Sequence, residues 1–208
     1  MRWYTIDALG ETDTGFRGNT TPTGMKVIPT ELPGVLILEP DVYQDERGYF
    51  LETYHAEKYA QYGVPERLVQ DNHSWSRHGV LRGLHYQLSK PQGKLVQVVH
   101  GEVFDVVVDI RRDSPNFRRW LGVKLSGDSH RQVYVPPGFA HGFCVLSESA
   151  DFLYKCTDFY SAGDEYGIIW NDPDIGIKWP SLDFQLSTRD RHNPRLKDMD
   201  EKLPVCSE

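Results

Sequence analysis

The chain has 208 residues, a net charge of −7 and a hydrophobic fraction of 39%. This length fits one domain whose core needs no disulfide or metal, and the ordinary residue balance excludes a wholly disordered chain. The negative charge argues against nonspecific binding to nucleic acid or acidic lipid, and no apolar run approaches the roughly 20 residues that cross a bilayer membrane. An anionic substrate would therefore need a local cluster of Arg and Lys.

Residues 1–24 show no hydrophobic periodicity and are rich in turn formers, whereas a regular pattern begins at Met25. We therefore expect a flexible extension over residues 1–24 and one domain over residues 25–208. The extension is too polar for the apolar part of a signal peptide. The spacing of the three cysteines matches neither a disulfide framework nor a zinc site: Cys144, Cys156 and Cys206. Sparse, unpaired cysteines favour a cytoplasmic location.

Local patterns predict many short strands and little helix. The one convincing helical stretch runs from His55 to Tyr62. The runs 95–99 and 103–110 are rich in β-branched residues and are joined by a short link with Gly101, which predicts a hairpin. Further strands are expected at 121–125, where apolar and polar residues alternate, and, after a turn at 126–129, at 132–135, 143–146 and 152–156. Such spacing predicts an all-β sandwich or barrel.

Four short segments concentrate polar groups of the kind that a site needs: 45–52, 70–74, 81–87 and 137–143. In the segment Leu81–Gln87, strand alternation places Arg82, Leu84 and Tyr86 on one face and Leu81, Gly83, His85 and Gln87 on the other. His85 and Gln87 are thus expected to point together, either into a barrel or to solvent.

From Met25 to about Leu196 the chain resembles the dTDP-4-dehydrorhamnose 3,5-epimerase family. The resemblance is carried by the motifs at 80–85 (VLRGLH), 92–96 (QGKLV), 101–106 (GEVFDV), 137–143 (PGFAHGF) and 170–172 (WND). Such density over the chain is more specific than any single motif. The resemblance implies a cupin-type jelly roll with short peripheral helices and a homodimer that exchanges N-terminal strands. It also implies epimerisation of a nucleotide-linked 4-keto sugar at C3 and C5, with no metal or cofactor.

The resemblance also implies catalytic roles. A proton on carbon beside a ketone can be removed because the resulting enolate spreads its charge onto oxygen. By resemblance, His85 is the base and Asp190 orients it, since a carboxylate fixes the tautomer of an imidazole. Lys94 would stabilise the oxyanion. Tyr154 would return the proton from the opposite face.

Other matched positions would hold the substrate. Arg47 and Arg82 match positions that contact the nucleotide and its phosphates, a task suited to bidentate Arg. Further binding positions match at Glu52, Gln70, Asn72, His141 and Glu165. Arg189 stands where some relatives carry Lys, and both are cations.

Each of these residues also has a structural interpretation. Lys94 and Arg82 could be solvated charges on a sheet face. Tyr154 could pack in the core with its hydroxyl hydrogen-bonded. The stretch Ser187-Thr188-Arg189-Asp190 could be only the first turn of a helix, and His141 could only shape a turn. For Glu52, Gln70, Asn72 and Glu165 the two interpretations are nearly even.

Three other functions compete with double epimerisation. A mono-epimerase or 3,4-ketoisomerase would act on a related nucleotide sugar. A metal-dependent cupin would need a His-x-His pair, but Gln87 occupies the second position. A sugar-binding module would bind the nucleotide without catalysis.

Overall fold

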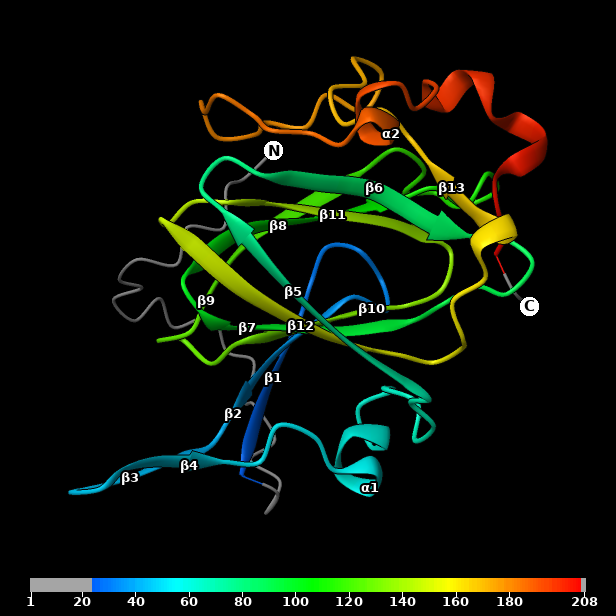
Figure 1. The fold of residues 1–208 in the computed structure, drawn as a ribbon. Helices are drawn as coiled ribbons and strands as arrows, with labels where there is room; N and C mark the ends of the chain where they lie inside the picture. The colour runs from blue at the N-terminus through cyan, green and yellow to red at the C-terminus, as the bar shows by residue number, and fades with distance from the viewer. Residues whose placement is uncertain (1–23, 207–208) are drawn as a thin grey trace, which may run out of the picture.

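The computed structural model describes residues 24–206 and consists mainly of strands in two facing sheets (Figure 1). The larger sheet has the order β1-β2-β10-β7-β12-β5. Its strands are β1 (Met25–Pro29), β2 (Leu36–Pro40), β5 (Gln70–Arg77), β7 (Lys94–His100), β10 (Gln132–Val135) and β12 (Ser149–Cys156). The sheet is antiparallel throughout, and β5 lies at its edge.

The smaller sheet has the order β13-β6-β11-β8-β9 and is also antiparallel. Its strands are β6 (Leu81–Gln87), β8 (Glu102–Asp109), β9 (Trp120–Ser126), β11 (Phe139–Val145) and β13 (Glu165–Gly167). Apolar side chains from both sheets, such as Val96, Val107 and Phe152, form the core between them. The two packed sheets confirm the predicted all-β jelly roll.

Helices are short and lie at the periphery. α1 (Ala56–Ala60) falls inside the stretch predicted as helical, and its Tyr59 packs on the outer face of the larger sheet. α2 (Thr188–Arg191) and the 3-10 turns η2 (Leu196–Asp198) and η3 (Asp200–Lys202) lie over the smaller sheet, and η1 (Ala162–Asp164) precedes β13 (Figure 1). Within residues 24–206, none of the helices combines the length and apolar character that a membrane span requires.

The predicted hairpin between 95–99 and 103–110 is wrong. Both runs are strands, β7 and β8, but they belong to different sheets. The chain crosses from one sheet to the other at Gly101, whose φ is +79°, and a Cβ there would lie 2.0 Å from the carbonyl oxygen of Ser149. Only glycine permits this tight crossing, which local sequence does not distinguish from a hairpin turn.

The other predicted strands are confirmed. In β9, Leu121, Val123 and Leu125 are buried and the residues between them are not, as the alternation indicated. The strand predicted at 132–135 has those bounds. The one at 152–156 is part of the longer β12, and the one at 143–146 overlaps the longer β11, which ends one residue earlier, at Val145. The predicted extension, residues 1–24, lies outside the described residues except for Gly24.

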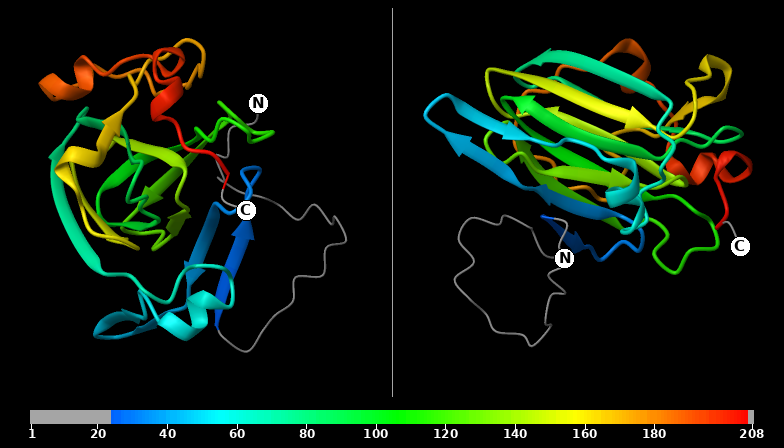
Figure 2. Two further views of the ribbon diagram at one scale, coloured as in Figure 1. Left: turned by 90° about the vertical axis from the view of Figure 1, so that its right-hand side faces the viewer. Right: turned by 90° about the horizontal axis from the view of Figure 1, so that it is seen from below.

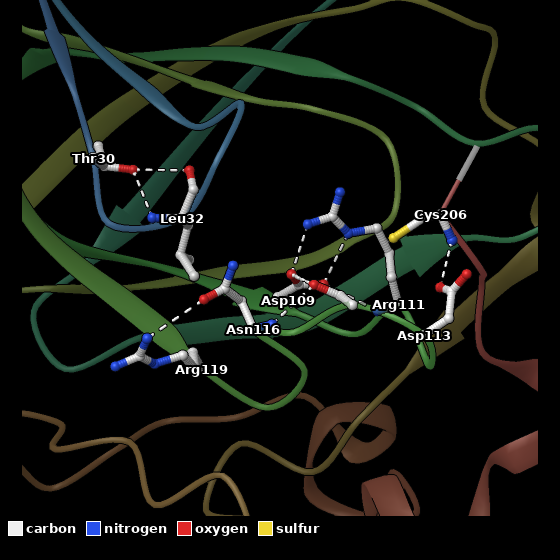
Figure 3. Close-up of polar contacts among 9 residues, drawn as sticks. Thr30, Leu32, Asp109, Arg111, Asp113, Asn116, Arg119 and Cys206 are labelled. Atoms are coloured by element: carbon white, nitrogen blue, oxygen red, sulfur yellow. Dashed lines mark hydrogen bonds and ion pairs between the residues drawn. The ribbon is translucent and has the colours of Figure 1, made fainter. Parts of the chain in front are cut away.

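A separate hairpin, β3 (Val42–Asp45) with β4 (Gly48–Leu51), projects away from the sandwich (Figure 1). Its apolar side chains are unusually exposed: Tyr43 is 62% exposed, Tyr49 58% and Phe50 69%. Two views at right angles to the first show the same two-layer sandwich end-on and from below (Figure 2). The C-terminal segment closes against the sandwich near the end of β8, where the backbone N–H of Cys206 donates to Asp113 at 2.7 Å (Figure 3).

Candidate active site

One cavity of about 320 Å³ lies between the two sheets. Its wall from the smaller sheet includes Arg82, His85 and His141, and its wall from the larger sheet includes Lys94 and Tyr154. The other lining residues are Ser74, Gly142, Phe143, Phe152, Ser187, Arg189 and Asp190. Seven of the residues that the sequence singled out thus meet in one place: Arg82, His85, Lys94, His141, Tyr154, Arg189 and Asp190.

The predicted strand alternation in Leu81–Gln87 is wrong before His85, because Leu81, predicted on the face of His85, packs with Leu84 and Tyr86 instead. Arg82 and His85 line the same cavity, although strict alternation put them on opposite faces. The cause is an irregular register between β6 and β11, because His85 pairs with His141 whereas Arg82 pairs with Phe143. One extra residue in β6 therefore puts both side chains on the side of the cavity, where Arg82 stays exposed at its rim. The strands approach closely there, since a Cβ on Gly83 would lie 2.6 Å from the Cα of Gly142.

His85 and Asp190 form a hydrogen-bonded pair. The Nε2–H of His85 donates to Asp190 Oδ1 at 2.5 Å, which leaves Nδ1 as the nitrogen available to a substrate. Asp190 lies in the first turn of α2, where its backbone N–H donates to the Ser187 hydroxyl at 3.0 Å. The predicted helical turn is therefore confirmed, and it positions the carboxylate against His85. Burial raises the pKa of Asp190, but the hydrogen bond and charge of His85 outweigh it and leave the pKa below its usual value.

Lys94 and Tyr154 face this pair from the larger sheet. Their strands are adjacent, and the Lys94 ammonium lies 5.9 Å from the centre of the Tyr154 ring. Burial lowers the pKa of Lys94, and the nearby acidic groups counter this only in part. Burial also raises the pKa of Tyr154, so its phenol is protonated at neutral pH. The cavity therefore holds a basic nitrogen on one wall and a phenol donor on the other.

Two arginines give the cavity positive charge. The Arg82 Nε–H donates to the buried Ser76 hydroxyl at 3.0 Å, which orients the guanidinium. This hydrogen bond does not use the two terminal nitrogens of the guanidinium. Among the residues that the structure describes, no carboxylate forms an ion pair with Arg82 or Lys94. Arg189 pairs with Glu165, whose carboxylate also accepts from the Tyr160 hydroxyl at 3.1 Å. The local cluster of cations that the acidic composition required is present.

Five predicted binding residues do not line this cavity, and one of them, Glu165, reaches it only through its ion pair with Arg189. Arg47 lies on the projecting hairpin and pairs with Asp45, and Glu52 follows β4 and pairs with Lys58 at 2.8 Å. Gln70 and Asn72 lie on the edge strand β5, where their side chains hydrogen-bond each other at 3.0 Å. Asn72 pairs in register with Tyr154, so it lies next to the cavity.

Sequence reasoning missed several lining residues. The Ser74 hydroxyl is buried and has no hydrogen-bond partner among the described residues. Phe143 and Phe152 stack with ring centres 4.1 Å apart and form an apolar part of the wall. In β5, exposure alternates strictly, and this could have placed Ser74 and Ser76 on the inward face. The aromatic pair comes from two sheets and has no signal in the sequence.

Gln87, which stands at the expected metal-ligand position, is engaged in structural contacts. Its side chain donates to the carbonyl of Lys90 at 2.7 Å and accepts from the backbone N–H of Ser161 at 2.8 Å. Within residues 24–206, no three His, Cys, Asp or Glu side chains gather in the way that a metal ion requires.

Comparisons with known proteins agree on one family. A family model described as dTDP-4-dehydrorhamnose 3,5-epimerase matches residues 29–198. The enzyme of that name from Shigella flexneri is 53% identical over 178 residues, which cover 85% of this chain and 98% of the relative. The crystal structure of a dTDP-6-deoxy-D-glucose-3,5-epimerase from Legionella pneumophila, in complex with dTDP-4-keto-L-rhamnose, is 50% identical with a TM-score of 0.86, and the match covers 88% of this chain and 100% of that one. A dTDP-4-dehydrorhamnose 3-epimerase from Streptomyces niveus is 41% identical over 169 residues, or 80% of this chain and 82% of the relative.

Proposed function

This chain belongs to the dTDP-4-dehydrorhamnose 3,5-epimerase family, and on that premise we propose that it inverts C3 and C5 of dTDP-4-dehydro-6-deoxy-D-glucose. The product is dTDP-4-dehydro-L-rhamnose. One observation carries the proposal: a His–Asp pair and a tyrosine hydroxyl face each other from the two sheets across one cavity. The three cysteines are free thiols, which fits a cytoplasmic enzyme.

The reaction begins with removal of a proton from the carbon beside the C4 ketone. Nδ1 of His85 takes this proton, and the Nε2–H···Asp190 hydrogen bond keeps the ring in the tautomer that leaves Nδ1 basic. Asp190 is only 5% exposed and stays ionised because its pKa is lowered. It therefore stabilises the imidazolium that forms.

The electrons of the broken C–H bond move to the ketone oxygen and form an enolate. Lys94 supplies the nearby positive charge, and one such donor in a site shielded from water is worth roughly 10²–10³ in rate. A proton from Tyr154 then reaches the carbon on the face opposite His85, which inverts it. The same groups act at C3 and at C5, since both carbons flank the C4 ketone.

The nucleotide extends from the sugar along the positive side of the cavity. Arg82 and Arg189 lie on that side, and bidentate guanidinium groups suit a diphosphate. Tyr160 is 51% exposed beside Arg189 and Glu165, so its ring can stack on the base.

Exchange in deuterated water tests this function against the mono-epimerase. With dTDP-4-keto-6-deoxyglucose as the substrate, NMR should show deuterium at both C3 and C5 and inversion at both carbons. Deuterium and inversion at one carbon would make the chain a mono-epimerase, as named for the Streptomyces niveus relative. Bound nucleotide with no exchange would indicate a binding module.

Arg82→Ala is expected to weaken binding of dTDP measured by calorimetry. A charge-assisted hydrogen bond is worth about 1.5–3 kcal/mol, and the exposure of Arg82 places the loss toward the lower end. The loss should shrink as salt rises, because ions screen an exposed charge. Arg77→Ala is a matched control, since Arg77 is an exposed cation on β5 whose guanidinium lies over Trp75 outside the cavity. Equal affinity in wild type and Arg82→Ala would remove Arg82 from the binding site.

We further propose that the enzyme is a homodimer in which β3–β4 of one protomer reaches the cavity of its partner. The hairpin exposes Tyr43, Tyr49 and Phe50, which a lone chain would leave in water. Arg47 and Glu52 match binding positions of the family but do not line the cavity of their own chain. Exchange of the hairpin accounts for both facts.

Complementation tests this exchange. His85→Asn and Arg47→Ala chains, each weakly active alone, are coexpressed in equal amounts. Random pairing should restore about a quarter of the wild-type activity, because about half of the dimers are mixed and each mixed dimer keeps one intact site. If each hairpin serves its own chain, mixed dimers contain two damaged sites and no activity returns.

A further inference from the structure

A second histidine in the cavity is also held by a carboxylate. The Nε2–H of His141, on β11, donates to Asp105 Oδ2, on β8, at 2.8 Å. The two strands are neighbours, and His141 is 7% exposed whereas Asp105 is fully buried. His141 lines the cavity, and Asp105 lies behind it in the smaller sheet.

The two histidine pairs have the same arrangement. In each, Nε2–H is given to a buried carboxylate, which leaves Nδ1 for a ligand. His85 and His141 are directly opposite each other on β6 and β11, and such pairs have Cβ atoms about 4.5–5.5 Å apart. A sugar whose C–H faces one imidazole therefore presents a neighbouring group to the other.

The fold alone does not account for Asp105. Its Oδ1 is buried without a hydrogen-bond partner among the described residues, and its strand neighbours Phe104 and Val106 are core residues. A buried carboxylate is costly unless it is paired. Asp109 on the same strand shows the structural alternative, since Arg111 and Ser114 saturate its oxygens at 2.6–2.9 Å (Figure 3). The bond to His141 is the only side-chain hydrogen bond of Asp105 in residues 24–206, and its charge also acts on Lys94.

We propose that Asp105 is a positioning residue of the epimerase, which fixes the His141 ring so that Nδ1 accepts a hydrogen bond from a hydroxyl group of the sugar. This inference rests on the proposed function. The contact holds the sugar ring so that its reacting C–H bond points at His85. Asp105 itself does not touch the substrate.

A double-mutant cycle tests whether Asp105 acts through His141. The variants are Asp105→Asn, His141→Gln and the two combined, with Asp109→Asn as the buried-carboxylate control on the same strand. Each single change at Asp105 or His141 should lower kcat/KM by roughly 10–100-fold, since a displacement of the sugar by about 1 Å from its reactive position can cost 10² in rate. The combined variant should be no slower than His141→Gln alone. Asp109→Asn should lower the melting temperature and leave kcat/KM of the folded enzyme unchanged.

Two kinetic outcomes would overturn the inference. One is wild-type kcat/KM in Asp105→Asn. The other is a combined loss equal to the product of the single losses, which would mean that Asp105 acts independently of His141.

Nitrogen-15 NMR of the imidazoles gives a readout that does not depend on activity. His141 in the wild-type enzyme should carry its proton on Nε2, and Asp105→Asn should change that tautomer, since an amide can donate to Nε2. A proton on Nδ1 in the wild type would refute the inference even if the asparagine variant does not fold. If the wild-type enzyme has no epimerase activity, the proposed function is refuted instead. The NMR experiment would still test whether Asp105 sets the tautomer of His141.

Discussion

Replacing His85 by Asn is expected to lower deuterium exchange at both C3 and C5 by about 10²–10⁴, the usual contribution of a general base. The Asn amide is smaller than the imidazole and polar like it, but it has no basic nitrogen. Binding of dTDP should remain within a few-fold of wild type, since the groups proposed to hold the phosphates, Arg82 and Arg189, are unchanged. Exchange is measured by NMR of the sugar and binding by calorimetry.

The matched control for His85→Asn is His78→Asn. His78 is also a histidine at the end of a strand, but it is exposed and its Nδ1 contacts the backbone carbonyls of Leu146 and Ser147. That variant should exchange at the wild-type rate. Near wild-type exchange in His85→Asn would show that another group is the base.

The strands of this fold could be predicted from sequence because their signals are local. The alternation at Leu121, Val123 and Leu125 reports burial on one face of β9, whatever strand lies beside it. Which strands pair is decided at long range. β7 and β8 contain the residues of a hairpin, yet each finds its neighbours elsewhere, β10 and β12 for one and β11 and β9 for the other.

The candidate site shows the same contrast between local signals, which the sequence carries, and long-range contacts, which it does not. His85 and Lys94 could be found because they stand in dense motifs, and Asp190 only because those motifs fix its place 105 residues beyond His85. The shared orientation of Arg82 and His85 could not be found, since it depends on the register with β11. Asp105 stands within a matched motif but looks like any residue of a strand until its contact with His141 is visible.

The other large effect concerns Tyr154, because inversion needs two faces. A base that returns its proton to the side it came from regenerates the starting sugar, so His85 alone gives exchange without inversion. Tyr154 lies on the opposite sheet, and burial raises its pKa above the ordinary value of about 10, which keeps it a donor at neutral pH.

Tyr154→Phe is therefore expected to keep the fold, retain exchange at C3 or C5, and lose most of the inverted product. The ring contacts with Phe152 and Lys94 do not need the hydroxyl, so the packing of the wall survives. General acid catalysis typically contributes about 10²–10⁴, and this is the loss expected in the rate of inversion. Tyr59→Phe is the control for removal of a buried phenol hydroxyl, because Tyr59 bonds Gln132 at 2.8 Å outside the cavity. The quantity to measure is the ratio of exchange to inversion by NMR. A variant that inverts as efficiently as it exchanges would show that the acid is another group, and Tyr154 would then be a core residue of β12.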